Sequence, residues 1–108
     1  MRRGANSALI GKWRIVEMGL WDKDYLDMVE PAYIQFQRNG LGEIRFGCVI
    51  GGLDCTLFAD AAEFTWEGSD EMDRVSGDGW AELDDDGTIS GEISFHLSDE
   101  STFKARKW

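Results

Sequence analysis

The chain has 108 residues, including 13 glycines and one proline, and a formal net charge of −10; this length fits a single domain. Residues 60–100 hold 14 acidic residues and one basic residue, a net charge of −13, whereas the remainder of the chain has a net charge of +3. Such a surface repels nucleic-acid phosphates and anionic membranes, so we exclude both as partners and expect a cationic small molecule or a basic protein partner.

Short stretches of alternating apolar and polar residues recur along the chain, separated by the Gly, Asn and Asp residues typical of turns. This pattern predicts an all-β fold, an antiparallel β-barrel of about eight strands in meander order with one short helix after the first strand. We expect residues 1–8 to form a flexible N-terminal tail and residues 9–108 to form a single barrel domain. A barrel of this size is either packed inside or holds one small ligand.

The first strand is expected over residues 10–18, with Trp13, Ile15 and Glu17 on one face. The alternation stops at residues 22–29, where an initial aspartate can cap a short helix. The single proline ends this helix, and residues 32–38 form the second strand.

Two turns are expected in the middle of the chain, over residues 39–41 and at residues 51–52. The second of them places Cys48 opposite Cys55, at a separation that a disulfide tolerates. We favour two reduced thiols that pack as small apolar groups, because we expect the protein to be cytoplasmic: no signal peptide and no membrane span is recognisable.

The next strand directs Trp66 inward and leads into a long acidic loop, residues 67–75. This loop lacks the ligand spacing and the glycine of a calcium loop. A turn at residues 85–87 then places Trp80 opposite Glu92 on the outer face of the following hairpin.

Gly11 and Trp13 on the first strand form a G-x-W sequence that resembles the signature of the lipocalin and calycin barrels. The resemblance implies that Trp13 plugs the closed end of the barrel and that Arg106, on the last strand, packs across it. It also implies that residues 22–29 act as a lid segment. The last strand follows a turn that we expect at residues 98–100.

Three further stretches, residues 21–25, 46–49 and 77–81, resemble a group of small bacterial proteins without an assigned function. This second resemblance implies a compact soluble domain and no particular chemistry.

Our leading functional prediction is the non-enzymatic binding of a small apolar or cationic ligand, in the barrel mouth or between subunits. Aromatic rings beside dense carboxylates favour cations, through cation–π contact combined with charge. Trp66 and Trp80 flank the expected acidic loop, and Trp80 is a large apolar side chain on a polar face. The candidate ligand-binding residues are Trp66, Trp80, Glu92, His96, Trp21 and Tyr25.

Two alternatives from other classes remain open. The first is an acidic protein–protein interaction module, or a homodimer formed through the strand face that bears Trp80. The second is a small enzyme that uses His96 as a general base with Glu92 or a nearby serine. We expect no cofactor and no metal site, because the chain has one histidine and two cysteines.

Overall fold

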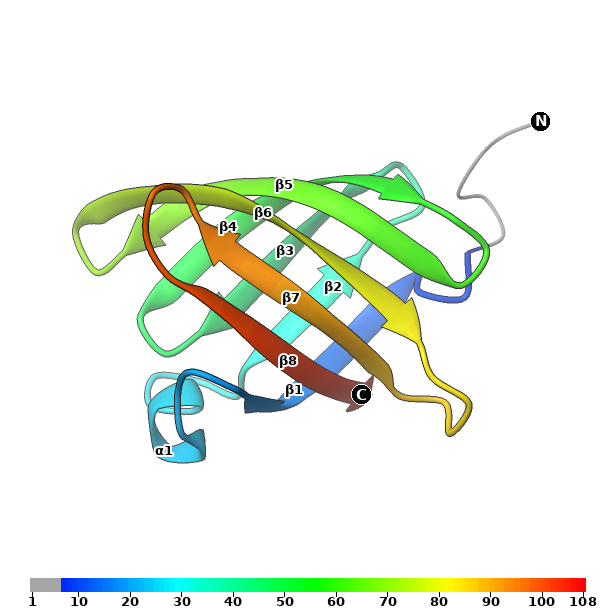
Figure 1. Cartoon of the computed structure of the whole chain (residues 1–108), viewed down its shortest axis with the longest axis horizontal. Coiled ribbons are helices and arrows are strands. Elements are labelled where there is room, and N and C mark those ends of the chain that lie inside the picture. Colours follow the sequence, from blue (N-terminus) through cyan, green and yellow to red (C-terminus); the bar gives the residue numbers. More distant parts are fainter. Residues whose placement is uncertain (1–6) are drawn as a thin grey trace.

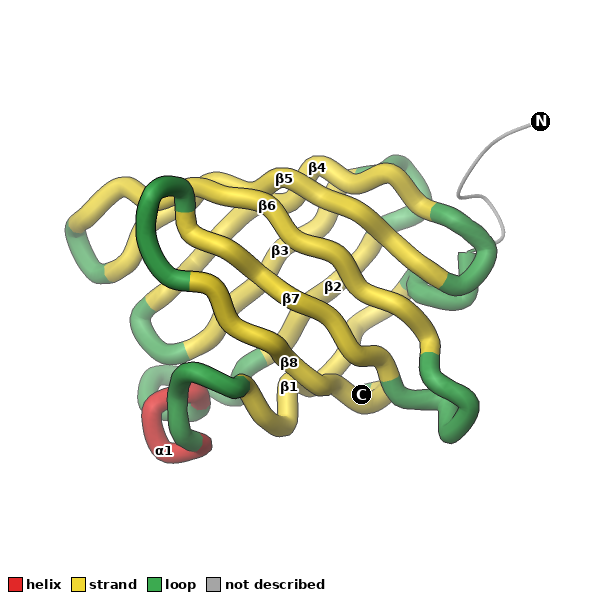
Figure 2. The backbone as a smooth tube through the Cα atoms, viewed as in Figure 1, coloured by secondary structure: helices red, strands yellow, loops and turns green. Residues whose placement is uncertain are grey.

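A computed structural model describes residues 7–108 and shows a closed barrel of eight antiparallel strands (Figure 1). The strands follow one another around the barrel in chain order, and one short helix follows the first strand, which confirms the predicted fold class. Short connections join the strands at both ends of the barrel (Figure 2). The elements are β1 (Gly11–Met18), α1 (Lys23–Leu26), β2 (Tyr33–Phe36), β3 (Leu41–Phe46), β4 (Val49–Leu57), β5 (Ala61–Asp70), β6 (Asp73–Leu83), β7 (Ile89–Phe95) and β8 (Glu100–Lys107).

The interior is filled by large apolar side chains from all parts of the barrel. They form one continuous buried cluster, because inward and outward positions alternate along each strand. Phe64 and Trp66 point inward, as their alternation with polar residues predicts. The largest side chains with less than 2% exposure belong to Trp13, Phe36, Phe46, Leu9, Ile15, Leu26, Ile34, Ile44, Ile89, Ile93 and Val49.

Strand β1 closes the barrel by pairing with both β2 and β8. A β-bulge between Ile15 and Glu17 adds one residue to β1 opposite β8. The bulge turns Glu17 outward and buries Met18 in its place. The expectation that Glu17 shares the inner face of Trp13 is therefore wrong, because strict alternation does not continue through a bulge.

One end of the barrel, which we call the base, is covered by the residues that precede β1. The first six residues of the expected tail lie outside the described part of the chain. Ala8 donates its backbone N–H to the carbonyl of Ala59 (2.8 Å), and Leu9 is fully buried. The indole Nε1 of Trp13 donates to the carbonyl of Leu9 (2.9 Å), so Trp13 plugs this end.

The basic residue over Trp13 is Lys107, not Arg106. The Lys107 ammonium lies 4.8 Å from the centre of the Trp13 ring. Arg106 is exposed and lies opposite Arg14 on the outer face, because side chains alternate along β8 and Ala105 occupies the inward position. The role implied for Arg106 by the lipocalin resemblance is therefore corrected.

The expected turn at residues 51–52 is wrong, because both glycines lie inside β4. The chain turns at Gly47 and Cys48 instead, with Gly47 in the left-handed region (φ 56°). A Cβ atom on Gly51 would lie 2.7 Å from the Trp66 ring, so this glycine makes room for an aromatic side chain. Cys55 then faces Phe64 across the sheet, and both cysteines are free thiols.

Two further connections differ from the expectation: the first is tighter, and the second is shifted along the chain. Strand β5 continues to Asp70 and β6 begins at Asp73, so the expected acidic loop is a hairpin with Glu71 and Met72 at its turn. At the β7–β8 connection, Phe95 donates its N–H to the carbonyl of Asp99 (2.8 Å), so the turn comes before residues 98–100. The β6–β7 hairpin has the predicted register.

Helix α1 lies at the other end of the barrel, which we call the mouth (Figure 1). Asp22 is its N-cap: the carboxylate accepts a hydrogen bond from the Tyr25 N–H (3.0 Å). The helix ends at Leu26, whose carbonyl accepts from the Gly47 N–H (2.8 Å), so it is shorter than residues 22–29. In the described part of the chain, no helix has the length and apolar character that crossing a membrane requires.

Candidate binding site

The outer face of β4–β7 carries a groove, which we call the acidic groove. Asp54, Thr65, Asp78 and Ser94 lie in line across these four strands, because each faces the next in the register of the sheet. Two compartments, of about 940 Å³ and 600 Å³, share the first three of these residues. The residues that line the groove are Gly52, Leu53, Asp54, Thr56, Glu63, Phe64, Thr65, Trp66, Glu67, Ser76, Gly77, Asp78, Gly79, Trp80, Ser94, Phe95, His96 and Leu97.

The lining of the groove is acidic. It includes the carboxylates of Asp54, Glu63, Glu67 and Asp78, all exposed, and neither lysine nor arginine. The ion pairs of the described residues do not include these carboxylates. Like charges gathered in a concave surface reinforce each other's field, so the groove attracts cations. Among the described residues, no three His, Cys, Asp or Glu side chains come together in a way that could hold a metal ion.

Trp80 stands at one end of the groove, on the outer face of β6. Its side chain is 38% exposed, and the indole Nε1 donates to Glu92 Oε1 (3.2 Å). Glu63 and Glu92 lie opposite Trp80 on the two neighbouring strands. The predicted register of the β6–β7 hairpin thus brings Trp80 and Glu92 together, and carboxylates flank the exposed ring on both sides.

Trp66 belongs to the core more than to the groove. It is 3% exposed, and its indole Nε1 donates to the carbonyl of Ser94 (3.1 Å). Its ring meets the Phe95 ring edge to face, with centroids 5.1 Å apart. A ligand in the groove would therefore touch only the rim of Trp66, because both sides of the ring are packed.

Trp21 and Tyr25 lie at the mouth, where they line a separate hollow of about 380 Å³ with Phe95 and His96. Trp21 stacks on Tyr25, with ring centroids 6.0 Å apart, and contacts Phe46 at 5.2 Å. Burial raises the pKa of Tyr25 above its usual value of 10.0. These rings close the interior at the mouth. Trp80 stands at the far end of the acidic groove, so Trp21 and Tyr25 do not share a site with it.

His96 stands at the end of β7 and lines both the mouth hollow and the acidic groove. Its backbone N–H donates to the carbonyl of Ser76 (2.7 Å), and its side chain is exposed. Glu92 accepts from Trp80, and the Ser94 hydroxyl donates to the Asp78 carboxylate. The hydrogen bonds of Glu92 and Ser94 thus orient them toward other partners than the His96 imidazole.

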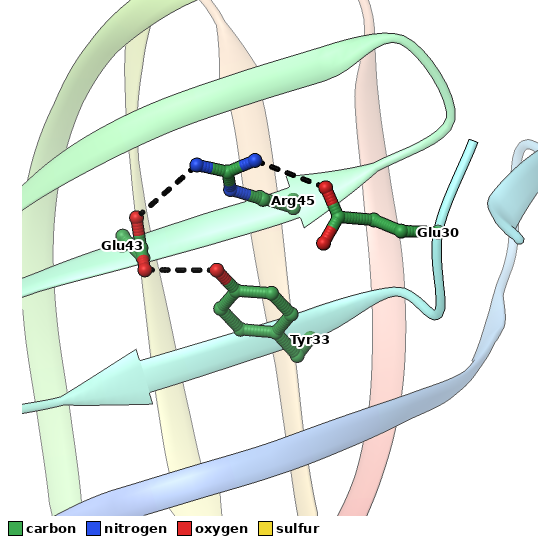
Figure 3. Close-up of polar contacts among 4 residues, drawn as sticks. All are labelled: Glu30, Tyr33, Glu43 and Arg45. Atoms are coloured by element: carbon green, nitrogen blue, oxygen red, sulfur yellow. Dashed lines mark hydrogen bonds and ion pairs between the residues drawn. The ribbon is translucent and has the colours of Figure 1, made fainter.

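A charged network on β2 and β3 was not anticipated from the sequence (Figure 3). Arg45 contacts Glu30 (Nη1–Oε2, 2.9 Å) and Glu43 (Nη2–Oε2, 3.8 Å), and the Tyr33 hydroxyl donates to Glu43 Oε1 (2.8 Å). Burial and the bond to Glu43 raise the pKa of Tyr33 to about 12. The register pairs Tyr33 with Arg45 across the two strands. The turn expected over residues 39–41 is wrong, because Leu41 already belongs to β3, and it would shift this pairing by two residues.

Comparison of the chain with models of protein families, with curated proteins and with solved structures yields no match. The functional argument therefore rests on the geometry of the groove and of the mouth.

Proposed function

We propose that the protein is a non-enzymatic binding protein with a lipocalin-like barrel that takes a small cationic ligand in the acidic groove. The observation that carries this proposal is the exposed Trp80 ring beside a concave surface lined by Asp54, Glu63, Glu67 and Asp78. A cation gains from both elements at once, because the ring attracts positive charge through its face and the carboxylates attract it through the field.

The packed interior supports a site on the outside of the barrel. Large side chains occupy the axis from Trp13 at the base to Phe46 and Trp21 at the mouth. An apolar ligand of the kind that lipocalins carry would have to displace them. A ligand in the groove displaces only water and relieves repulsion among carboxylates that take part in none of the ion pairs of the described residues.

The contacts around Trp80 and His96 also bear on the two alternatives, an enzyme and a homodimer. An enzyme based on His96 gains no support, because Glu92 and Ser94 are engaged elsewhere. A homodimer through the face of Trp80 would bring two acidic surfaces together, which opposes association. We further propose a cytoplasmic location, which the free thiols of Cys48 and Cys55 support.

The test is isothermal titration of the purified protein with organic cations of three kinds: a quaternary ammonium compound, a polyamine and a guanidinium compound. We expect binding at low salt that weakens as the salt concentration rises. Trp80→Ala and the double variant Asp54→Asn/Glu63→Gln should each lower the affinity by about tenfold or more, because each removes one of the two attractions.

The matched control is Glu82→Gln on β6, which removes a carboxylate from the same outer face but outside the groove lining. Its affinity should stay within about twofold of the unmodified protein. Equal affinity for the cations in Trp80→Ala, Asp54→Asn/Glu63→Gln and the unmodified protein would refute the proposed site.

A further inference from the structure

We infer that the mouth of the barrel is a second binding surface, which docks a polypeptide segment that is rich in lysine or arginine and carries one apolar face. This inference does not rest on the proposed function, although the two surfaces meet at His96 and Leu97, which also line the near end of the acidic groove. It rests on four features of the mouth: exposed apolar side chains, two hollows, an acidic border and the backbone conformation of two turns.

Exposed apolar side chains gather at the mouth. Of the ten large apolar side chains that are exposed in residues 7–108, six belong to the segments at this end. Met72 and Leu97, at the tips of the β5–β6 and β7–β8 connections, are 97% and 94% exposed. Exposed apolar groups gathered at one end of a protein are a feature of interaction sites. The six residues are Leu20, Met28, Val29, Ile50, Met72 and Leu97.

Two hollows lie among these segments, so the mouth is a contoured surface. The first, described above, combines the rings of Trp21, Tyr25 and Phe95 with polar and charged groups that include aspartates and an arginine. The second, of about 250 Å³, is lined by apolar groups that include Val29, Phe46, Val49 and Ile50, with Glu71 at its border. An apolar anchor of a partner could enter the second hollow, as anchor residues do at the centre of protein interfaces, and another could pack on the rings of the first.

The border of the mouth is acidic. Residues 19–30, 69–74 and 96–100 together hold nine carboxylates and two basic side chains. Among residues 7–108, two of these carboxylates form ion pairs, Asp27 with Arg14 and Glu30 with Arg45. An anionic membrane and a second copy of this chain would both meet repulsion here, whereas a basic segment with an apolar face matches both the centre and the border.

Two residues at the turns of the mouth have backbone conformations that glycine favours. Glu71 has a φ of 58° and Leu97 a φ of 59°, and for a leucine this conformation is costly. A glycine in place of Leu97 would relieve the cost and remove the exposed side chain. Strain kept at a surface position where the side chain has no buried partner is typical of a functional site.

The test uses a synthetic peptide of leucine and lysine whose leucines line one face of a helix. We expect it to bind the unmodified protein, and the double variant Met72→Ser/Leu97→Ser to bind it at least tenfold more weakly. Trp80→Ala, in the groove, is the matched control and should keep the affinity within about twofold. A scrambled peptide of the same composition should bind at least tenfold more weakly, because its leucines no longer share one face.

Three outcomes would overturn the inference. Loss of peptide binding in Trp80→Ala but not in Met72→Ser/Leu97→Ser would place the peptide in the acidic groove, and would leave the proposed function standing. Association with vesicles of zwitterionic lipid that requires Met72 and Leu97, in a protein that ignores the peptide, would show a membrane surface. A concentration-dependent dimer that is lost in Met72→Ser/Leu97→Ser would show that a second copy covers the mouth.

Discussion

The two sides of the barrel differ in whether their charged side chains are paired within the chain. On the side formed by β1–β3, each basic group has a partner: Arg14 pairs with Asp27, Arg45 with Glu30, and the Lys12 ammonium lies 4.1 Å from the centre of the Tyr33 ring. On β4–β7 the carboxylates of the groove take part in none of the ion pairs of the described residues. Charged groups that pair within the chain stabilise the fold, whereas carboxylates outside such pairs can attract a cationic ligand.

The largest effect of this difference is expected from a matched pair of arginine substitutions. Arg45→Met leaves Glu30 and Glu43 without a cation and should lower the free energy of unfolding by roughly 1–2 kcal/mol. Arg74→Met on β6 removes an arginine from the acidic side, where no ion pair of the described chain includes it. It should change stability by less than about 0.5 kcal/mol, as urea unfolding would show. An equal decrease in the free energy of unfolding in both variants would contradict the proposed difference in charge pairing between the two sides.

The second prediction concerns the Tyr33 hydroxyl. Tyr33→Phe removes its hydrogen bond to Glu43 and should cost about 1 kcal/mol at neutral pH. The pKa of Tyr33 is raised from 10.0 to about 12, so the folded state favours the protonated hydroxyl. Its contribution to stability is fully present below pH 10 and is lost as the pH rises toward 12. The stability difference between the two proteins should therefore shrink over this range, and a constant difference in urea unfolding would contradict the assignment.

The smallest effect is expected on the acidic side. Glu63→Gln removes one of several neighbouring carboxylates without breaking an ion pair of the described residues. It should raise the free energy of unfolding by up to about 0.5 kcal/mol at low salt, and added salt should reduce this gain because it screens the same repulsion. Thermal unfolding at two salt concentrations measures both effects, and a loss of stability would mean that Glu63 has a structural role.

The turns show how far the sequence could predict the structure. The β6–β7 hairpin was read correctly, because its turn contains aspartates and Gly87, which has a φ of 86°. The β5–β6 and β7–β8 turns were misread, because their left-handed positions hold Glu71 and Leu97, residue types that give no turn signal. The opposite error occurs at Gly51 and Gly52: this pair resembles a turn in the sequence but lies inside β4.

Contacts in the candidate site could be predicted only where the register between the strands was predicted correctly. Trp80 and Glu92 share a correctly predicted hairpin, and their contact follows from it. Trp66 was predicted to point inward, but its burial away from the proposed ligand depends on its packing against Phe95, which no local pattern contains. The groove itself spans four strands, so it could be seen only after every register between them was fixed.

The pairing of β1 with β8 has a consequence for the order of events during synthesis. Of the eight strands, β1 is made first and has β2 as one neighbour, but its other neighbour, β8, is the last of the eight to be made. Until then β1 and β7 each present an unpaired edge, which is a hazard for pairing with other chains. Final closure joins contacts that are distant in the sequence and is expected to be slow. A nascent chain stalled before β8 would therefore need protection that the finished barrel does not.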